Sequence, residues 1–407
     1  MADDSEMRKR TFISIGGGEL QIPVLTWAKE AGYHVAVTDR RSGCAAAELA
    51  DEFAVVDGSD VLGLVEFAES VSKRNPVSCV YSGADFGLLS AAQVQRQLGI
   101  AAASPAAVEL ALDKARSKKV WRKNGISTPL GDVASSAKCA LGVIQSMELP
   151  LIIKPVDSCG SQGVSSIWSY AGADAAVENA FNYSNRVVIE EIVHGRHIDV
   201  NGLFIHGEFF PAGIMERFFS DPPFHYSIWG YEPAGIDDEK KQEVYDVLEK
   251  SARFLGIEHG PVKGDIILTK NGAIIIELAP RFHGNIISAY LSPFAEGINP
   301  IRAFLEMCAG NKEALRILKP DSKSLVAGWR AIFPPERRKI DHAESVKAIK
   351  QVEGVYNVFL VPNAGCDRRQ YRDNRRIIGF VWVQGDNRCD VEKKLSIACN
   401  RLQYANE

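Results

Sequence analysis

The sequence lacks any long hydrophobic segment and any strong excess of one charge. No apolar stretch approaches the ~20 residues that a helix needs to span a bilayer. Residues 1–6 are acidic where a secretory signal would be basic, so we expect a cytoplasmic protein with no membrane partner. The formal net charge of −4 argues against a dedicated nucleic-acid surface, and no nucleic-acid partner is expected.

Closely spaced cysteine pairs are also missing. The eight cysteines are scattered, with no Cys-x-x-Cys pair, which argues against a zinc knuckle and a disulfide framework. Cys159 lies in a glycine-rich loop, where a small residue filling a tight turn is favoured over a redox role. His194 and His197 have no third soft ligand nearby, so a zinc site is not expected there.

The length and the order of elements predict more than one unit. A chain of 407 residues, 46% hydrophobic and 24% charged, is an ordinary composition for two or three soluble domains. Strands and helices alternate as far as residue 105, which is typical of a doubly wound parallel α/β sheet. An α+β mixture follows, and a polar break near residue 319 suggests a third unit. The strands expected in the first unit are residues 11–15, 35–37, 53–56 and 79–81.

Two apolar segments carry carboxylates and are separated by a turn. Residues 274–276 are three isoleucines, followed by Glu277 and then by Arg281, and burying either charge without a partner would be costly. Asp265 begins a second apolar segment, and the break at residues 270–272 predicts a hairpin that brings both carboxylates to the same end. Adjacent carboxylates repel each other unless a cation lies between them, and oxygen ligands suit magnesium or manganese.

A strand at residues 149–153 leads into Lys154 and a loop of small residues, Ser158–Gly163. Backbone N–H groups in such a loop can approach polyphosphate oxygens while the ammonium supplies charge. The Gly-Lys-Ser/Thr ending of a P-loop is absent. Taken alone, the loop is equally well explained as a hairpin turn.

The segment 187–193 is an apolar strand that ends in Glu190, Glu191 and a short linker. The free backbone edge of such a strand can hydrogen-bond the edge of an adenine ring, and a polar residue just beyond can reach ribose hydroxyls. A solvated turn is the simpler interpretation of the two glutamates alone.

Taken together, these motifs resemble the ATP-grasp superfamily in their order and spacing. The resemblance covers roughly residues 106–310. It implies a Rossmann-like domain at residues 1–105, an ATP-grasp domain at 106–318 with a flexible lid at about 131–195, and a small α+β domain at 319–407. That last domain looks like the one in the L-amino acid ligase branch. The matching motifs are Asp113-Lys114, residues 153–155, residues 190–195, Asp265 and residues 277–281.

The resemblance also implies ATP and Mg²⁺, or Mn²⁺, as cofactors, with a role for each matching residue. Lys114 and Lys154 would contact the phosphates, and Arg281 would neutralise developing negative charge, with Lys154 also catalytic. Asp265 and Glu277 would hold the metal. His197 stands where the similar site of biotin carboxylase places a ribose ligand. The loop over the phosphates would include Ser158, Ser161 and Gly163, and adenine would be held by Glu190, Glu191, Ile192 and Val193.

The function that the resemblance implies is an ATP-dependent carboxylate–amine ligase. It would form an amide or peptide bond through an acyl phosphate, releasing ADP and phosphate. A carboxylase or an acyl-phosphate-forming kinase would use the same residues, although a biotin-carrier Met-Lys-Met segment is absent. A nicotinamide-dependent oxidoreductase is less favoured, because Gly16–Gly18 lacks the third fingerprint glycine even though Asp39 lies at a suitable distance.

The substrates are expected to be a small carboxylate and a small amine, and a homodimer is compatible with the sequence. Arg217, His225 and Lys263 are candidate receptors for a substrate carboxylate, although exposed charges on a packed loop explain them about equally well. Ala279 replaces an asparagine common in the family, and Asn285 is a candidate to substitute for it. The basic segment 367–376 is by default a solvated hairpin, with a cover over an anionic substrate as the sharper alternative.

Overall fold

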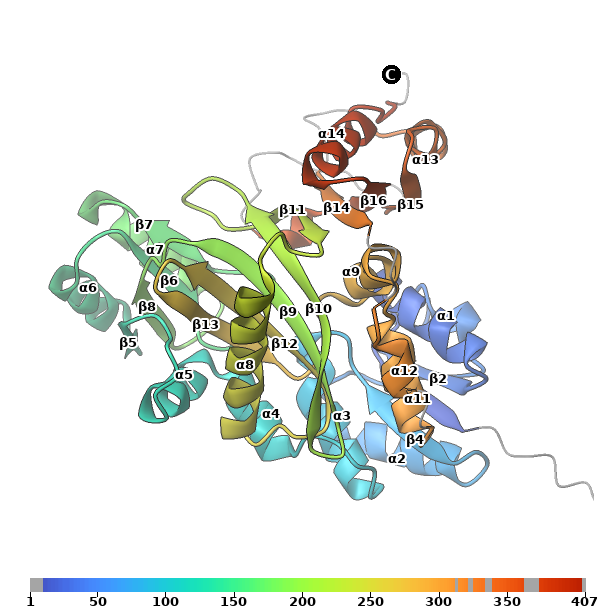
Figure 1. Ribbon diagram of the computed structural model, residues 1–407. Coiled ribbons are helices and arrows are strands. Elements are labelled where there is room, and N and C mark those ends of the chain that lie inside the picture. Colours follow the sequence, from blue (N-terminus) through green and yellow to red (C-terminus); the bar gives the residue numbers. More distant parts are fainter. Residues whose placement is uncertain (1–9, 312–313, 321–324, 334–338, 362–372, 405–407) are drawn as a thin grey trace, which may run out of the picture.

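The computed structural model describes residues 10–311, 314–320, 325–333, 339–361 and 373–404, without the side chains of residues 285, 286 and 314 (Figure 1). Its strands form three sheets, and the large central sheet lies between the two smaller ones. The mixed α/β class expected from the sequence is confirmed. None of the helices in these ranges combines the length and apolar composition needed to cross a lipid bilayer.

The first sheet is parallel, with strand order β3-β2-β1-β4. Its inner strands are buried on both faces because helices cover both sides, and apolar residues such as Phe12 and Ile13 fill the two cores. The alternation predicted as far as residue 105 is confirmed. The elements are β1 (Thr11–Ile15), α1 (Ile22–Glu30), β2 (His34–Asp39), β3 (Glu52–Val55), α2 (Val61–Ser72), β4 (Val77–Tyr81), the short helix η3 (Asp85–Gly87) and α3 (Leu88–Gln97).

The second sheet is antiparallel, with order β5-β8-β6-β7, and falls within the range expected for the lid. Helices α6 and α7 cover one face, and residues such as Ile144, Leu151 and Ile189 form its separate core. The elements are β5 (Gly131–Ala134), α6 (Ala137–Ser146), β6 (Leu151–Pro155), β7 (Ser165–Ile167), α7 (Ala173–Phe181) and β8 (Val187–Glu191).

The central sheet has eight antiparallel strands in the order β13-β12-β9-β10-β11-β14-β16-β15. Helix α8 packs its apolar side, including Val244 and Leu248, on β9, β12 and β13. The strands are β9 (Arg196–Ile205), β10 (Glu208–Phe219), β11 (Ser227–Glu232), β12 (Gly260–Thr269), β13 (Gly272–Ala279), β14 (Val326–Ile332), β15 (Val355–Leu360) and β16 (Gly379–Gly385). The helices around it are α8 (Asp238–Phe254), α9 (Asn285–Tyr290), α10 (Ser292–Ala295), α11 (Pro300–Cys308), α12 (Ala314–Ile317), α13 (His342–Lys350) and α14 (Arg388–Cys399).

The strands expected in the third unit extend the central sheet. Strand β14 pairs with β11 on one side and with β16 on the other. The sheet therefore continues across residue 319, and the domain boundaries drawn from the sequence stay predictions.

Helices α4 (Pro105–Leu112) and α5 (Lys114–Lys123) connect the first unit to the other two sheets. The Asp113 side chain caps α5 by accepting a hydrogen bond from the Arg116 N–H. The Lys114 N–H donates to the carbonyl of Val156 just after β6 (2.9 Å). At the other end of the helix, the buried Trp121 donates to the carbonyl of Ser251 in α8 (3.1 Å). The start of α5 is thereby fixed beside the glycine-rich loop.

Candidate functional site

Three neighbouring strands of the central sheet each carry one carboxylate at the same register. Asp265 on β12 is paired with Glu277 on β13 and with Asp199 on β9. Directly paired residues project on the same face of a sheet, so the antiparallel hairpin predicted for Asp265 and Glu277 is confirmed. Sequence reasoning missed Asp199. The period-two polar pattern His197, Asp199, Asn201 within an apolar strand was the available signal.

Lysine ammonium groups lie between these carboxylates. Lys263 Nζ is 2.5 Å from Asp265 Oδ1 and 3.4 Å from Glu277 Oε1, and Lys114 Nζ is 3.5 Å from Glu277 Oε2. Burial acts to lower the pKa of Lys263, but the two carboxylates outweigh it and raise the pKa. Ala279 is paired with Lys263, so a long cationic side chain stands opposite the position where the family often has asparagine.

The donor set of Asp265 and Glu277 fits a divalent cation. Both carboxylates face one cationic group, and hard oxygen ligands are what magnesium prefers. Their mutual repulsion is nevertheless balanced in this structure by Lys263, so repulsion alone does not require a metal.

Arg217 also lies between two of the carboxylates. Its Nε is 2.9 Å from Asp199 Oδ2, and its Nη2 is 3.3 Å from Asp265 Oδ2. His283 Nδ1 lies 3.3 Å from Asp199 Oδ2, and Asp199, Asp265 and His283 are close enough together to hold a metal. The guanidinium already supplies a cation there, so we do not assign a metal to this trio. Arg217, predicted as a receptor for a substrate carboxylate, is engaged here by carboxylates of the protein itself.

A second charged cluster connects α5 to the second sheet. The Glu190 side chain is completely buried, and its Oε2 accepts from Lys154 Nζ (3.1 Å) while Oε1 pairs with Lys118. Burial acts to raise the pKa of Glu190, but the charges of Lys118 and Lys154 outweigh it and hold the pKa below its usual range. Burial lowers the pKa of Lys118 to about 8, with Glu190 opposing. The solvated-turn interpretation is therefore wrong for Glu190.

The neighbouring Glu191 behaves differently, since it is exposed and accepts from the Leu130 N–H (2.9 Å). Sequence reasoning missed Lys118. The signal for it was the spacing of four residues from Lys114, which places both lysines on one face of a helix.

The glycine-rich loop is the hairpin connection between β6 and β7. Gly160 and Ser161 both have positive φ, 63° and 62°, which is the backbone of a tight type I′ turn. The loop also lies against the first lysine of α5, because Lys114 Nζ donates to the Ser158 carbonyl (2.6 Å). The hairpin turn left open by the sequence is therefore present, and phosphate binding by the loop stays a prediction.

Arg281 is held by the first unit. Its Nε donates to Asp85 Oδ1 (2.5 Å) in η3, and its Nη1 donates to the Phe282 carbonyl (3.0 Å). Burial acts to raise the pKa of Asp85, but the Arg281 charge outweighs it and lowers the pKa. Sequence reasoning missed Asp85 as a partner of Arg281.

The remaining residues predicted for the site have the following environments. The exposed His197 ring packs on Phe219, with centroids 4.9 Å apart. Burial and the nearby Lys154 charge lower the pKa of His225 to about 4, so this ring is neutral at pH 7. Ile192 and Val193 are half-buried in the linker after β8. Asn285 opens α9, but its side chain lies outside the described part of the chain, as do residues 367–372 of the basic segment.

The structure offers no support for a nicotinamide site after β1. The Asp39 carboxylate accepts from the Gly17 N–H (3.0 Å) and the Arg41 N–H (2.9 Å), so it is used to hold the glycine turn.

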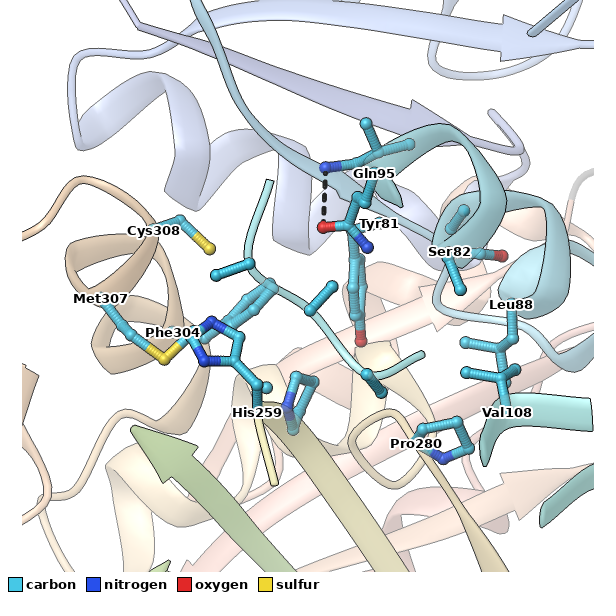
Figure 2. Close-up of a pocket in the computed structure, with 18 residues that line it drawn as sticks. Tyr81, Ser82, Leu88, Gln95, Val108, His259, Pro280, Phe304, Met307 and Cys308 are labelled. Atoms are coloured by element: carbon cyan, nitrogen blue, oxygen red, sulfur yellow. Dashed lines mark hydrogen bonds between the residues drawn. The ribbon is translucent and has the colours of Figure 1, made fainter. Parts of the chain in front are cut away.

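A small cavity lies between the first unit and the start of β12, lined by Tyr81, His259, Pro280, Phe304 and neighbouring residues (Figure 2). Its volume of about 50 Å³ has room for a water molecule or two, and nucleotide-sized ligands need roughly 300 Å³ or more. This cavity is therefore not a nucleotide site.

Comparison with known proteins shows a match to one domain family and a shared fold. Residues 147–289 match the model of the ATP-grasp domain family. A D-alanine–D-alanine ligase of Pseudomonas putida is 30% identical over 154 residues, which is 37% of this chain and 48% of that enzyme. An alanine–anticapsin ligase of Bacillus amyloliquefaciens is 24% identical over 278 residues, 62% of this chain and 58% of that enzyme. The matches thus span about half the length of these relatives.

Two solved structures share the fold over nearly the whole chain. An L-amino acid ligase from Bacillus licheniformis superposes with a TM-score of 0.82 at 18% identity, covering 98% of this chain and 99% of the other. The biotin carboxylase domain of a 2-oxoglutarate carboxylase from Hydrogenobacter thermophilus, solved with magnesium ADP and bicarbonate, gives 0.74 at 16% identity, covering 98% and 91%.

Proposed function

Because residues 147–289 match the ATP-grasp domain family, we propose that the chain is an ATP-dependent carboxylate–amine ligase releasing ADP and phosphate. The observation that carries the proposal is the position of Lys114. Its Nζ is 2.6 Å from the Ser158 carbonyl in the glycine-rich loop and 3.5 Å from Glu277 Oε2. One ammonium thus lies between the candidate phosphate loop and a candidate metal carboxylate, where it would meet a polyphosphate bound between them.

The nucleotide would lie between the lid sheet and the central sheet. Lys114 and Lys154 supply positive charge for the phosphates, with Glu190 holding Lys154 in place (3.1 Å). The loop Ser158–Gly163 would cover the phosphates through its backbone N–H groups. The β8–β9 linker would receive adenine, and His197 would receive the ribose.

The metal carboxylates would be Asp265 and Glu277. Magnesium bound there supplies positive charge at the phosphate oxygens. Because Lys263 already neutralises both carboxylates, its ammonium competes with a metal for the same oxygens.

Arg281 would stabilise the reacting carboxylate. A carboxylate is a poor electrophile until one of its oxygens becomes a good leaving group, which phosphorylation achieves. The guanidinium, oriented by Asp85, would neutralise negative charge on the acyl phosphate and on the tetrahedral species formed when the amine attacks. Among the charges facing Arg281, Asp85 and Glu277 raise its pKa although burial acts to lower it, so it stays cationic throughout.

The test is ADP and phosphate release across a matrix of carboxylates and amines, beginning with pairs of amino acids. A ligase needs both substrates and yields stoichiometric ADP, phosphate and amide. Release of AMP, or full turnover without any amine, would rule the ligase out. Glu277→Gln should lose the activity, whereas Glu66→Gln, which changes an exposed carboxylate on α2 of the first unit, should keep it.

A carboxylase is the second candidate, favoured by the likeness to the biotin carboxylase domain at TM-score 0.74. Its signature would be ADP release that depends on bicarbonate and not on a carboxylate substrate. Incorporation of labelled bicarbonate into an acid-stable product would establish it.

A further inference from the structure

A segment near the end of the chain lies directly against the glycine-rich loop. Asn374, the first residue of the short helix η6 (Asn374–Arg376), donates its backbone N–H to the carbonyl of Gly160 (3.1 Å). Its side-chain Oδ1 accepts from the Ser227 N–H at the start of β11 (2.9 Å). One residue therefore connects the tip of the loop to the central sheet.

The next residue reaches the other end of the loop through Tyr183. Arg375 Nη2 donates to the Tyr183 hydroxyl (2.8 Å), and the guanidinium carbon lies 5.3 Å from the centre of the ring. The ring in turn packs on Gly163, where an added Cβ would lie 2.8 Å from Tyr183 Cδ2. The buried Asp373 holds the Arg375 guanidinium in place by accepting two hydrogen bonds from it, Nε to Oδ1 (3.0 Å) and Nη2 to Oδ2 (2.7 Å), and its Oδ1 also accepts from the Arg375 backbone N–H (2.9 Å).

We propose that Asp373–Arg376 is a positioning segment for the glycine-rich loop, acting on Gly160 through Asn374 and on Gly163 through Arg375 and Tyr183. The ATP-related part of this inference rests on the proposed function, in which the loop covers the phosphates. The described residues 373–376 of the basic segment thus pack on the protein rather than form a solvated hairpin, and a cover over an anionic substrate stays a prediction.

Such positioning would increase the affinity for the nucleotide because it lowers the conformational entropy that the loop loses on binding. Gly160 is exposed, and glycine loses more conformational freedom on ordering than any other residue. A loop that is ordered only when the nucleotide arrives reduces the affinity by that ordering cost. Contacts from a separate part of the chain order the loop beforehand, so the nucleotide binds more tightly.

Substitutions at Asn374 separate its two contacts. Asn374→Ala removes only the acceptor for Ser227, whereas Asn374→Pro also removes the N–H that donates to Gly160. Proline fits the first position of a helix, and Asp373 before it is extended (φ −156°, ψ 176°), as a residue preceding proline should be. Asn374→Asp keeps the acceptor and is the matched control.

The first measurement needs no nucleotide. Hydrogen–deuterium exchange of peptides covering residues 158–164 should be about fivefold faster in Asn374→Pro than in the wild type, which is what losing one hydrogen bond permits. Asn374→Ala should be intermediate, and Asn374→Asp should match the wild type. Equal exchange in all four proteins would overturn the proposal.

The second measurement is kinetic. Asn374→Pro should raise the KM for ATP about fivefold and leave kcat unchanged, with Asn374→Asp restoring the wild-type KM. An unchanged KM beside faster exchange would overturn the positioning role in ATP binding. If the wild type bound no ATP at all, the proposed function would fall, while exchange would still decide whether the segment orders the loop.

A second pair of variants tests the proposal even if Asn374→Pro does not fold. Arg375→Ala removes the contact to Tyr183, and Tyr183→Phe removes the hydroxyl but keeps the ring on Gly163. Exchange at residues 161–164 should rise more in Arg375→Ala than in Tyr183→Phe. The reverse order, or no change in either, would contradict the role of Arg375.

Discussion

Replacing Lys118 with methionine tests the buried ion pair between Lys118 and Glu190. The two side chains are 2% and 0% exposed, and removing one partner of such a pair typically costs about 3–5 kcal/mol. Lys154 remains as a second partner, with its Nζ 3.1 Å from Glu190 Oε2 and 12% of its side chain exposed. We therefore expect the free energy of unfolding to fall by about 2–3 kcal/mol, below that range.

The assay is urea unfolding of four proteins: the wild type, Lys118→Met, Glu190→Gln and the double variant. Glu190→Gln leaves two ammonium groups without their shared carboxylate, so the double variant should be more stable than Glu190→Gln alone, giving a favourable coupling energy. Lys119→Met changes the adjacent, exposed lysine of α5 and should alter stability by no more than about 0.5 kcal/mol. A loss in Lys118→Met no larger than in Lys119→Met would refute the reasoning.

The stabilisation by ionised Glu190 is also expected to depend on pH. Burial acts to raise the pKa of Glu190, but Lys118 and Lys154 outweigh it and lower the pKa. Stabilisation by a carboxylate with a depressed pKa is complete above its unfolded pKa, about 4.3, and is lost as the pH falls through the folded value. The stability difference between the wild type and Glu190→Gln should thus be largest near pH 7 and shrink in acid. A difference that is the same at about pH 7 and about pH 3 would contradict the ionised state of Glu190.

Three further substitutions test the proposed catalytic centre. Glu277→Gln should abolish ADP release, because one charged ligand of the proposed metal is lost; near-normal turnover would contradict the role of Glu277 as a metal ligand. Arg281→Ala should leave ATP affinity by calorimetry nearly intact while stopping turnover, since its proposed partner is charge that develops only during reaction; weaker ATP binding with unchanged turnover would place Arg281 elsewhere. Asp85→Asn should lower kcat with little change in the KM for ATP, because the carboxylate orients Arg281 at 2.5 Å, and a kcat equal to that of the wild type would remove Asp85 from the mechanism.

Features that depend on neighbouring residues could be predicted from the sequence. The hairpin that pairs Asp265 with Glu277 follows from two apolar segments and a short turn, because a tight turn sets the register of the strands it joins. The alternation in the first unit follows in the same way from periodicity and segment length. Lys154 was placed beside a loop of small residues because they are adjacent in the chain.

Contacts between distant segments were decided only by the tertiary structure. Asp85 and Arg281 are 196 residues apart, and Asn374 and Ser227 are 147 apart. Periodicity shows which face of an element is apolar but not which other element will cover it. The sequence by itself therefore determined a set of charged residues at strand and helix ends. The packing of three sheets decided which charge meets which: Glu190 with Lys118, Arg281 with Asp85, and Lys263 with both proposed metal carboxylates.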